Sequence, residues 1–158
     1  MVEVMATIAY RLVGDDLMLF VCGDASPSDS EWQEYLRFME GLAQRSRASR
    51  TALKTLVFAD DGGLNPKQRA SVVEVLRGVT TRTAVVSTSV LARNLITAFG
   101  WLNFAVRGFS PNHLDDVSKY LELPADRMRE VMAAAAAMAP SIGGVRCLDR
   151  ALRGREAS

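Results

Sequence analysis

Two short apolar runs open the chain, and a polar turn separates them. Residues 6–13 and 17–22 are mostly apolar, and Gly14, Asp15 and Asp16 lie between them. Glycine and aspartate tolerate the positive φ angles that a tight turn requires. The pattern therefore predicts an antiparallel β-hairpin.

The polar segment after the hairpin is typical of a helix start. Ser28 and Glu31 have the spacing of a capping box, in which each side chain accepts a hydrogen bond from the other residue's backbone. Apolar residues then recur at the helical period, namely Trp32, Tyr35, Leu36, Met39, Leu42 and Ala43. We expect this helix to fray within residues 45–50, which alternate between arginine and small residues.

Three strand-and-helix units are expected next. The predicted strands are residues 53–59, 83–87 and 104–109, and the helices after them begin near Asn65, Ser89 and Ser110. A parallel strand cannot be reached by a tight turn, so each of these units implies a crossover. The order ββαβαβαβα thus predicts an α/β domain whose mostly parallel sheet has about five strands, with the hairpin at its N-terminus.

A last apolar segment occupies residues 124–139, and we assign residues 124–158 to a C-terminal helical extension of a domain formed by residues 1–123. One helical face of this segment carries Met128, Val131, Met132, Ala135 and Met138. Two roles remain open for that face. It packs on the parent sheet, or it forms the interface of a two-fold homodimer, for which small alanines and adaptable methionines are suited.

Composition and charge restrict the partners. Of the 158 residues, 49% are hydrophobic and 23% are charged, which is ordinary for a globular chain. The formal net charge of +1 provides no overall field that would attract nucleic acid or an anionic membrane. We therefore expect a folded domain that binds neither.

Several expected absences indicate a cytoplasmic protein. The first residues lack the basic region, the apolar run and the cleavage site of a secretory signal, and no apolar run is long enough to span a membrane. Cys22 and Cys147 are far apart and have no CxxC or histidine partners. Such cysteines fit buried thiols in a reducing compartment, without a disulfide or a zinc site.

Four strings of the sequence carry a family resemblance. They are Glu31 with Trp32, residues 65–69 (NPKQR), residues 83–93 leading to Gly100 and Trp101, and residues 106–114. Together with the order of elements, they resemble the SpoIIAA-like proteins, which are relatives of the STAS (sulfate transporter and anti-sigma-factor antagonist) domain. The resemblance covers about residues 6–123, and it implies non-enzymatic binding of a protein or a small ligand, often in bacterial regulation.

One feature departs from this family. Anti-sigma-factor antagonists carry a phosphorylated serine at the start of the helix after the second central strand. The matching residues here, 60–66, read DDGGLNP and contain no serine or threonine. The resemblance therefore does not extend to phosphorylation control at this point.

The acidic pair Asp60 and Asp61 follows a predicted strand, where carboxylates could bind Mg²⁺. The lysine that a phosphate-accepting pocket requires is absent, so an exposed turn that caps a helix is the better interpretation. We expect alanine at either position to leave folding intact. The candidate partner or ligand surface near these strand ends comprises Asp60, Asp61, Asn65, Ser87, Ser89, Arg93 and Trp101.

No complete catalytic set is visible in the sequence. His113 is the only histidine, which excludes a multi-histidine metal site. Neither a GxSxG nucleophile motif nor a glycine-rich phosphate loop is present. We therefore assign no catalytic residue, no metal and no cofactor.

Two further groups of residues, one basic and one aromatic, could contact a ligand or could have ordinary structural roles. Basic residues cluster at Arg45, Arg47, Arg50 and Lys54, and again at Arg146, Arg150, Arg153 and Arg155. Because no aromatic residues alternate with them, a solvated surface is favoured over phosphate contacts. Trp101, with Trp32 and Phe109, could line an apolar pocket, although aromatic residues at helical spacing more often fill a core.

The preferred function is thus a STAS-like regulatory or scaffolding domain that binds a protein partner without catalysis. The alternative is a carrier of a small, lipid-like ligand, and an enzyme of unknown class ranks third.

Overall fold

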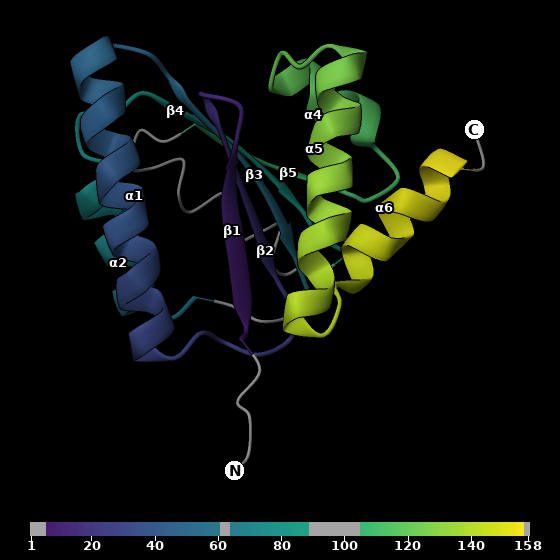
Figure 1. Cartoon of the computed structure of the whole chain (residues 1–158), viewed down its shortest axis with the longest axis horizontal. Helices are drawn as coiled ribbons and strands as arrows, with labels where there is room; N and C mark the ends of the chain where they lie inside the picture. Colours follow the sequence, from purple (N-terminus) through teal and green to yellow (C-terminus); the bar gives the residue numbers. More distant parts are fainter. Residues whose placement is uncertain (1–5, 61–63, 89–104, 157–158) are drawn as a thin grey trace.

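The computed structural model describes residues 6–60, 64–88 and 105–156. These residues form a five-stranded sheet between two layers of helices (Figure 1). The described elements are β1 (Ile8–Val13), β2 (Leu17–Cys22), α1 (Asp29–Ser49), β3 (Leu53–Ala59), α2 (Pro66–Val75), β4 (Thr81–Val86), β5 (Ala105–Phe109), α4 (Leu114–Tyr120), α5 (Ala125–Met138), a 3-10 helix (Ala139–Ile142) and α6 (Arg146–Glu156). The predicted helix over residues 91–102 lies outside the described residues.

The N-terminal hairpin is confirmed. Strands β1 and β2 pair antiparallel, from Ile8 opposite Cys22 to Val13 opposite Leu17. Gly14 in the turn has a φ of 67°, and a Cβ atom there would lie 2.8 Å from the guanidinium of Arg127. The turn therefore favours glycine for its backbone conformation, whereas the flexible end of the Arg127 side chain could move away from a Cβ atom.

The remaining strands follow in consecutive order, and each pairs parallel with the one before it. This confirms the predicted fold class, an α/β domain with a mostly parallel sheet behind an N-terminal hairpin. Consecutive crossovers of one hand place their helices on the same face of a sheet. Helices α1 and α2 do lie together on one face (Figure 1).

The core of this first face joins alternate residues of β2 to the apolar stripe of α1. The ring of Tyr35 lies 4.9 Å from the rings of both Phe20 and Trp32, and 5.1 Å from that of Tyr10. Trp32 Nε1 donates a hydrogen bond to Ser71 Oγ at 3.2 Å, which connects α1 to α2. The predicted capping box of Ser28 and Glu31 is present at the start of α1.

Helices α4, α5 and α6 cover the opposite face. The other residues of β2 pack there with apolar side chains from all three helices. The apolar face of α5 was predicted either to pack in the core or to form a dimer interface. Its Met138 is half-buried, and its other four residues are buried: Met128, Val131, Met132 and Ala135. The face packs on the parent sheet, so within this chain it is not presented to a second copy.

Helix α1 differs from expectation at its end. The sequence predicted fraying within residues 45–50, whereas the helix continues to Ser49 and ends at Arg50 in the left-handed conformation. Arg47 donates hydrogen bonds to the carbonyl oxygens of Arg77 and Val75, each at 2.7 Å. These bonds hold the last turn of α1 against the end of α2.

In the part of the chain that is described, no helix combines the length and the apolar character needed to cross a bilayer.

Candidate functional site

Asp60 lies at the carboxyl edge of the parallel strands, directly after β3. The residue is only 5% exposed. Its Oδ2 accepts a hydrogen bond from the backbone N–H of Arg146 at 2.8 Å, and its Oδ1 accepts one from that of Cys147 at 3.0 Å. Both amides belong to the first turn of α6, whose positive dipole end favours a carboxylate. The expectation of an exposed turn is therefore wrong for Asp60, which caps a helix far along the chain.

Arg146 adds ion pairs at the same edge. Its Nη2 lies 2.6 Å from Asp24 Oδ1, and its Nε lies 3.8 Å from Asp60 Oδ2. Asp24 belongs to the loop after β2. One arginine thus connects the ends of β2 and β3 to the start of α6, which Figure 1 shows against the sheet.

Both thiols near this edge are buried and not in a disulfide, as the sequence predicted. Burial, and secondly the charge of Asp60, raise the pKa of the Cys22 thiol to about 12. The same two causes raise the pKa of Cys147, whose Sγ donates to the carbonyl oxygen of Val86 at 3.5 Å. A thiol is a nucleophile only when it is ionised. These cysteines therefore act as packing residues, with Cys22 and Cys147 on opposite faces of the sheet.

The rest of the predicted surface is only partly described. Ser87 is fully buried after β4, and its backbone N–H donates to the carbonyl oxygen of Phe109 at 3.1 Å. Asn65 caps α2, where its Oδ1 accepts a bond from the backbone N–H of Gln68 at 2.8 Å. Four members lie outside the described residues: Asp61, Ser89, Arg93 and Trp101.

The predicted apolar pocket is not supported by the two aromatic residues that the structure describes. Trp32 packs into the core on the α1 side of the sheet, and Phe109 packs into the core on the α5 side. Because the sheet lies between them, they do not line one pocket.

His113 is exposed, and its Nδ1 lies 3.4 Å from Asp116 Oδ2 within the first turn of α4. Across residues 6–60, 64–88 and 105–156, no three side chains of the types that bind metals are grouped together.

The two basic clusters lie at different places on the molecule. Arg45 and Arg47 belong to the last turns of α1, and Arg47 is bonded to the end of α2. Arg150 and Arg153 are exposed on α6, which begins at the carboxyl edge. The predicted solvated surface fits the exposed arginines, whereas Arg47 has a structural role that the sequence did not reveal.

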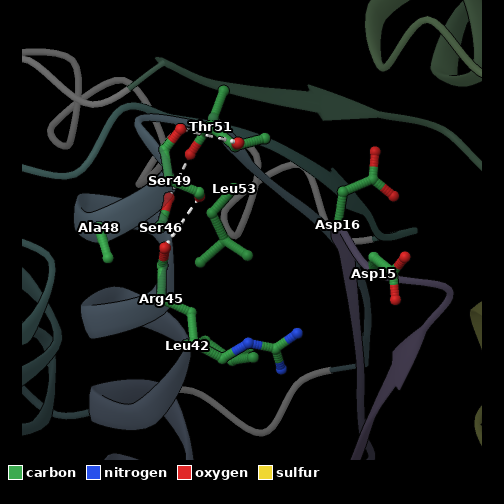
Figure 2. A pocket seen from close by; sticks show the side chains of 10 residues that line it. Asp15, Asp16, Leu42, Arg45, Ser46, Ala48, Ser49, Thr51 and Leu53 are labelled. Carbon is green, nitrogen blue, oxygen red and sulfur yellow. Dashed lines mark hydrogen bonds between the residues drawn. The ribbon is translucent and has the colours of Figure 1, made fainter.

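A groove of about 710 Å³ lies at the opposite, amino edge of the sheet. The hairpin turn forms one wall, the last turns of α1 form the other, and the loop to β3 closes it (Figure 2). Its lining residues are Asp15, Asp16, Leu42, Arg45, Ser46, Ala48, Ser49, Thr51, Ala52 and Leu53. Sequence reasoning missed this groove because it assigned Asp15 and Asp16 to a turn and Arg45 to a basic cluster, and nothing local connects the two.

Comparisons with models of protein families, with curated proteins and with solved structures found no match to this chain.

Proposed function

We propose that the chain is a non-enzymatic regulatory or scaffolding domain of the SpoIIAA-like type, which works in the cytoplasm by binding a protein partner. The observation that carries this proposal is that Asp60 caps helix α6 instead of facing a substrate site. Open α/β sheets place their substrates at the carboxyl edge of the strands. At this edge Asp60 instead holds the first turn of α6 through two backbone hydrogen bonds.

The reactive groups near Asp60 support the same proposal. General acid–base catalysis needs a group that reaches the substrate and titrates near the working pH. Burial and the charge of Asp60 raise the pKa values of Cys22 and Cys147 away from that range. Ser87 is fully buried, and the Nδ1 atom of the exposed His113 lies 3.4 Å from Asp116 Oδ2 within the first turn of α4.

The partner is proposed to be recognised through shape and local charge rather than through a long-range field. The formal net charge is only +1, so charge would contribute little to steering a distant partner. The exposed residues of α1 and α6 carry both signs of charge, which suits a protein surface better than a polyanion.

Affinity purification of the tagged chain from its own host, followed by native mass spectrometry, tests the proposal. We expect one co-purifying protein at fixed stoichiometry, and slower hydrogen exchange over one continuous surface of the chain in the complex. An unrelated protein with the same tag controls for non-specific capture. A stoichiometric small molecule in place of a protein would indicate the carrier, and turnover in a substrate screen would indicate an enzyme.

A further inference from the structure

The groove at the amino edge of the sheet has the size of a small-molecule site. Its volume of about 710 Å³ lies within the range of roughly 300–1,000 Å³ that such sites occupy. The groove lies at the amino edge of the sheet, and the capped start of α6 lies at the carboxyl edge. Binding of a ligand in the groove therefore does not depend on the protein-binding role proposed above. Either role could fail without the other.

Two side chains of opposite charge line the groove without meeting. Figure 2 shows Arg45 extending from α1 toward the wall that carries Asp15. Within the described residues, neither the Asp15 carboxylate nor the Arg45 guanidinium forms a hydrogen bond or an ion pair. Both charges are therefore available to a ligand.

The other polar side chains of the groove are already engaged. The carboxylate of Asp16 pairs with Arg127 Nη2 at 3.3 Å. Ser46 Oγ donates to the carbonyl oxygen of Thr51, and Ser49 Oγ donates to the carbonyl oxygen of Arg45 at 2.9 Å. Recognition by charge thus falls to Asp15 and Arg45.

The lining residues indicate where the positive and the negative group of a ligand would bind. The Asp15 carboxylate lies on the wall formed by the turn, which favours an ammonium group there. Arg45 offers the fork geometry that binds a carboxylate. The exposed Ala48 supplies aliphatic surface along the same groove, whereas the lining residues Leu42 and Leu53 are only 7% and 4% exposed.

We infer that this groove binds a small zwitterion in which an aliphatic spacer separates an ammonium group from a carboxylate. The ammonium group pairs with Asp15, and the carboxylate pairs with Arg45. A simple anion would meet the carboxylates of the turn, and a simple cation would meet Arg45, so neither fits as well as a molecule that carries both.

Titration of the isotope-labelled protein with terminal amino acids, followed by amide NMR, tests the inference. The probes are aminobutanoate, aminohexanoate and aminooctanoate with the amine on the last carbon, and the matched single-charge probes are hexylamine and hexanoate. We expect saturable shifts at Asp15, Asp16 and residues 45–53. We also expect the best zwitterion to bind about two to five times more tightly than either single-charge probe, as for one exposed ion pair.

Two variants separate the roles of the charges. Asp15→Asn should remove the preference for the zwitterion over hexanoate, and Arg45→Gln should remove its preference over hexylamine. Arg37→Gln and Glu40→Gln make the same charge changes at exposed positions of α1 that do not line the groove, and they should leave both preferences intact. Dispersed amide spectra confirm that each variant is folded.

Four results would overturn the inference. The shifts could fall outside the groove, the single-charge probes could bind as tightly as the zwitterion, or the Asp15→Asn and Arg45→Gln variants could keep full preference. Absence of saturable shifts at millimolar concentrations of every probe would also overturn it.

Discussion

A buried carboxylate is stabilised only if hydrogen-bond donors replace the water that it loses. Asp60 receives two backbone N–H groups and lies beside the guanidinium of Arg146. Without this carboxylate, the part-buried amide of Arg146 and the buried amide of Cys147 would have no acceptor at that position. The residue therefore holds the C-terminal helix to the end of β3.

Replacing Asp60 by alanine tests this role. We expect Asp60→Ala to lower the free energy of unfolding by about 2 kcal/mol, because the helix cap is lost and two amides are left unsatisfied. Asp60→Asn should cost less, since its amide oxygen still accepts one bond. Urea denaturation measures both, with Glu40→Ala on the exposed side of α1 as the control. A change for Asp60→Ala as small as that of the control would show that the cap contributes little.

Glu31 should make stability depend on pH. Its carboxylate accepts bonds from the backbone N–H and the hydroxyl of Thr7, at 2.8 and 3.0 Å, and also from Ser28. Burial alone would raise the pKa of Glu31, but these hydrogen bonds outweigh it and lower the pKa below its usual value of 4.5. The folded state therefore favours the ionised form, and this stabilisation is complete above pH 4.5 and lost as the pH falls toward the folded-state pKa.

The Glu31→Gln variant checks the sign of this effect. Its free energy of unfolding should be below that of the parent at neutral pH, and the difference should shrink below pH 4.5. Urea midpoints across this range provide the measurement. A constant difference at all pH values would indicate that packing, and not the charge of Glu31, is responsible.

At the scale of elements, the consecutive order of the parallel strands explains the position of α5. With only α1 and α2 packed on the sheet, the other face of β2 and β3 would be exposed to water. Helices α5 and α6 supply the apolar surface that covers it. This leaves the apolar stripe of α5 inside the domain rather than at a dimer interface.

Ala135→Glu tests the position of α5. Ala135 is fully buried, so a carboxylate there would lie in the core without a partner and should cost about 3 to 5 kcal/mol of unfolding free energy. Its neighbour Ala136 is exposed, so Ala136→Glu should change stability by less than about 0.5 kcal/mol. Thermal unfolding followed by circular dichroism compares the two. A folded Ala135→Glu monomer derived from a parent dimer would restore the interface interpretation.

At the scale of the whole molecule, one sheet supports two cores. Alternate residues of β2 pack into the two different core clusters, so both helical layers depend on contacts with this one strand. Arg127 also ties α5 to the hairpin turn through the carbonyl oxygen of Val13 and the carboxylate of Asp16. We therefore expect the C-terminal extension to unfold together with the rest of the chain.

A variant with Trp101→Phe keeps Trp32 as its one tryptophan, on the face opposite α6. In this background, Leu148→Ala removes a fully buried side chain from α6 and should cost about 2 to 5 kcal/mol. Tryptophan fluorescence and far-ultraviolet circular dichroism should shift to the same lower urea midpoint. Separate midpoints for the two signals would show that the extension unfolds as an independent unit.

The features that the sequence predicted correctly depend on residues close together in the chain. The capping box of Ser28 and Glu31, the turn at Gly14 and the cap at Asn65 each involve neighbours within a few positions. The periods of apolar residues likewise distinguish strands from helices, because side-chain direction follows local backbone geometry. Together these signals determined the element types, and with the crossover argument they determined the fold class.

The tertiary structure decided which distant groups meet. Strand order places α5 in the core, Asp60 finds its partners 86 and 87 residues away, and the groove joins the turn at Asp15 to Arg45 on α1. Each of these depends on pairing between strands and packing between layers. Apolar surfaces attract without direction, so the chain's local pattern specifies that a face is buried but not which element covers it.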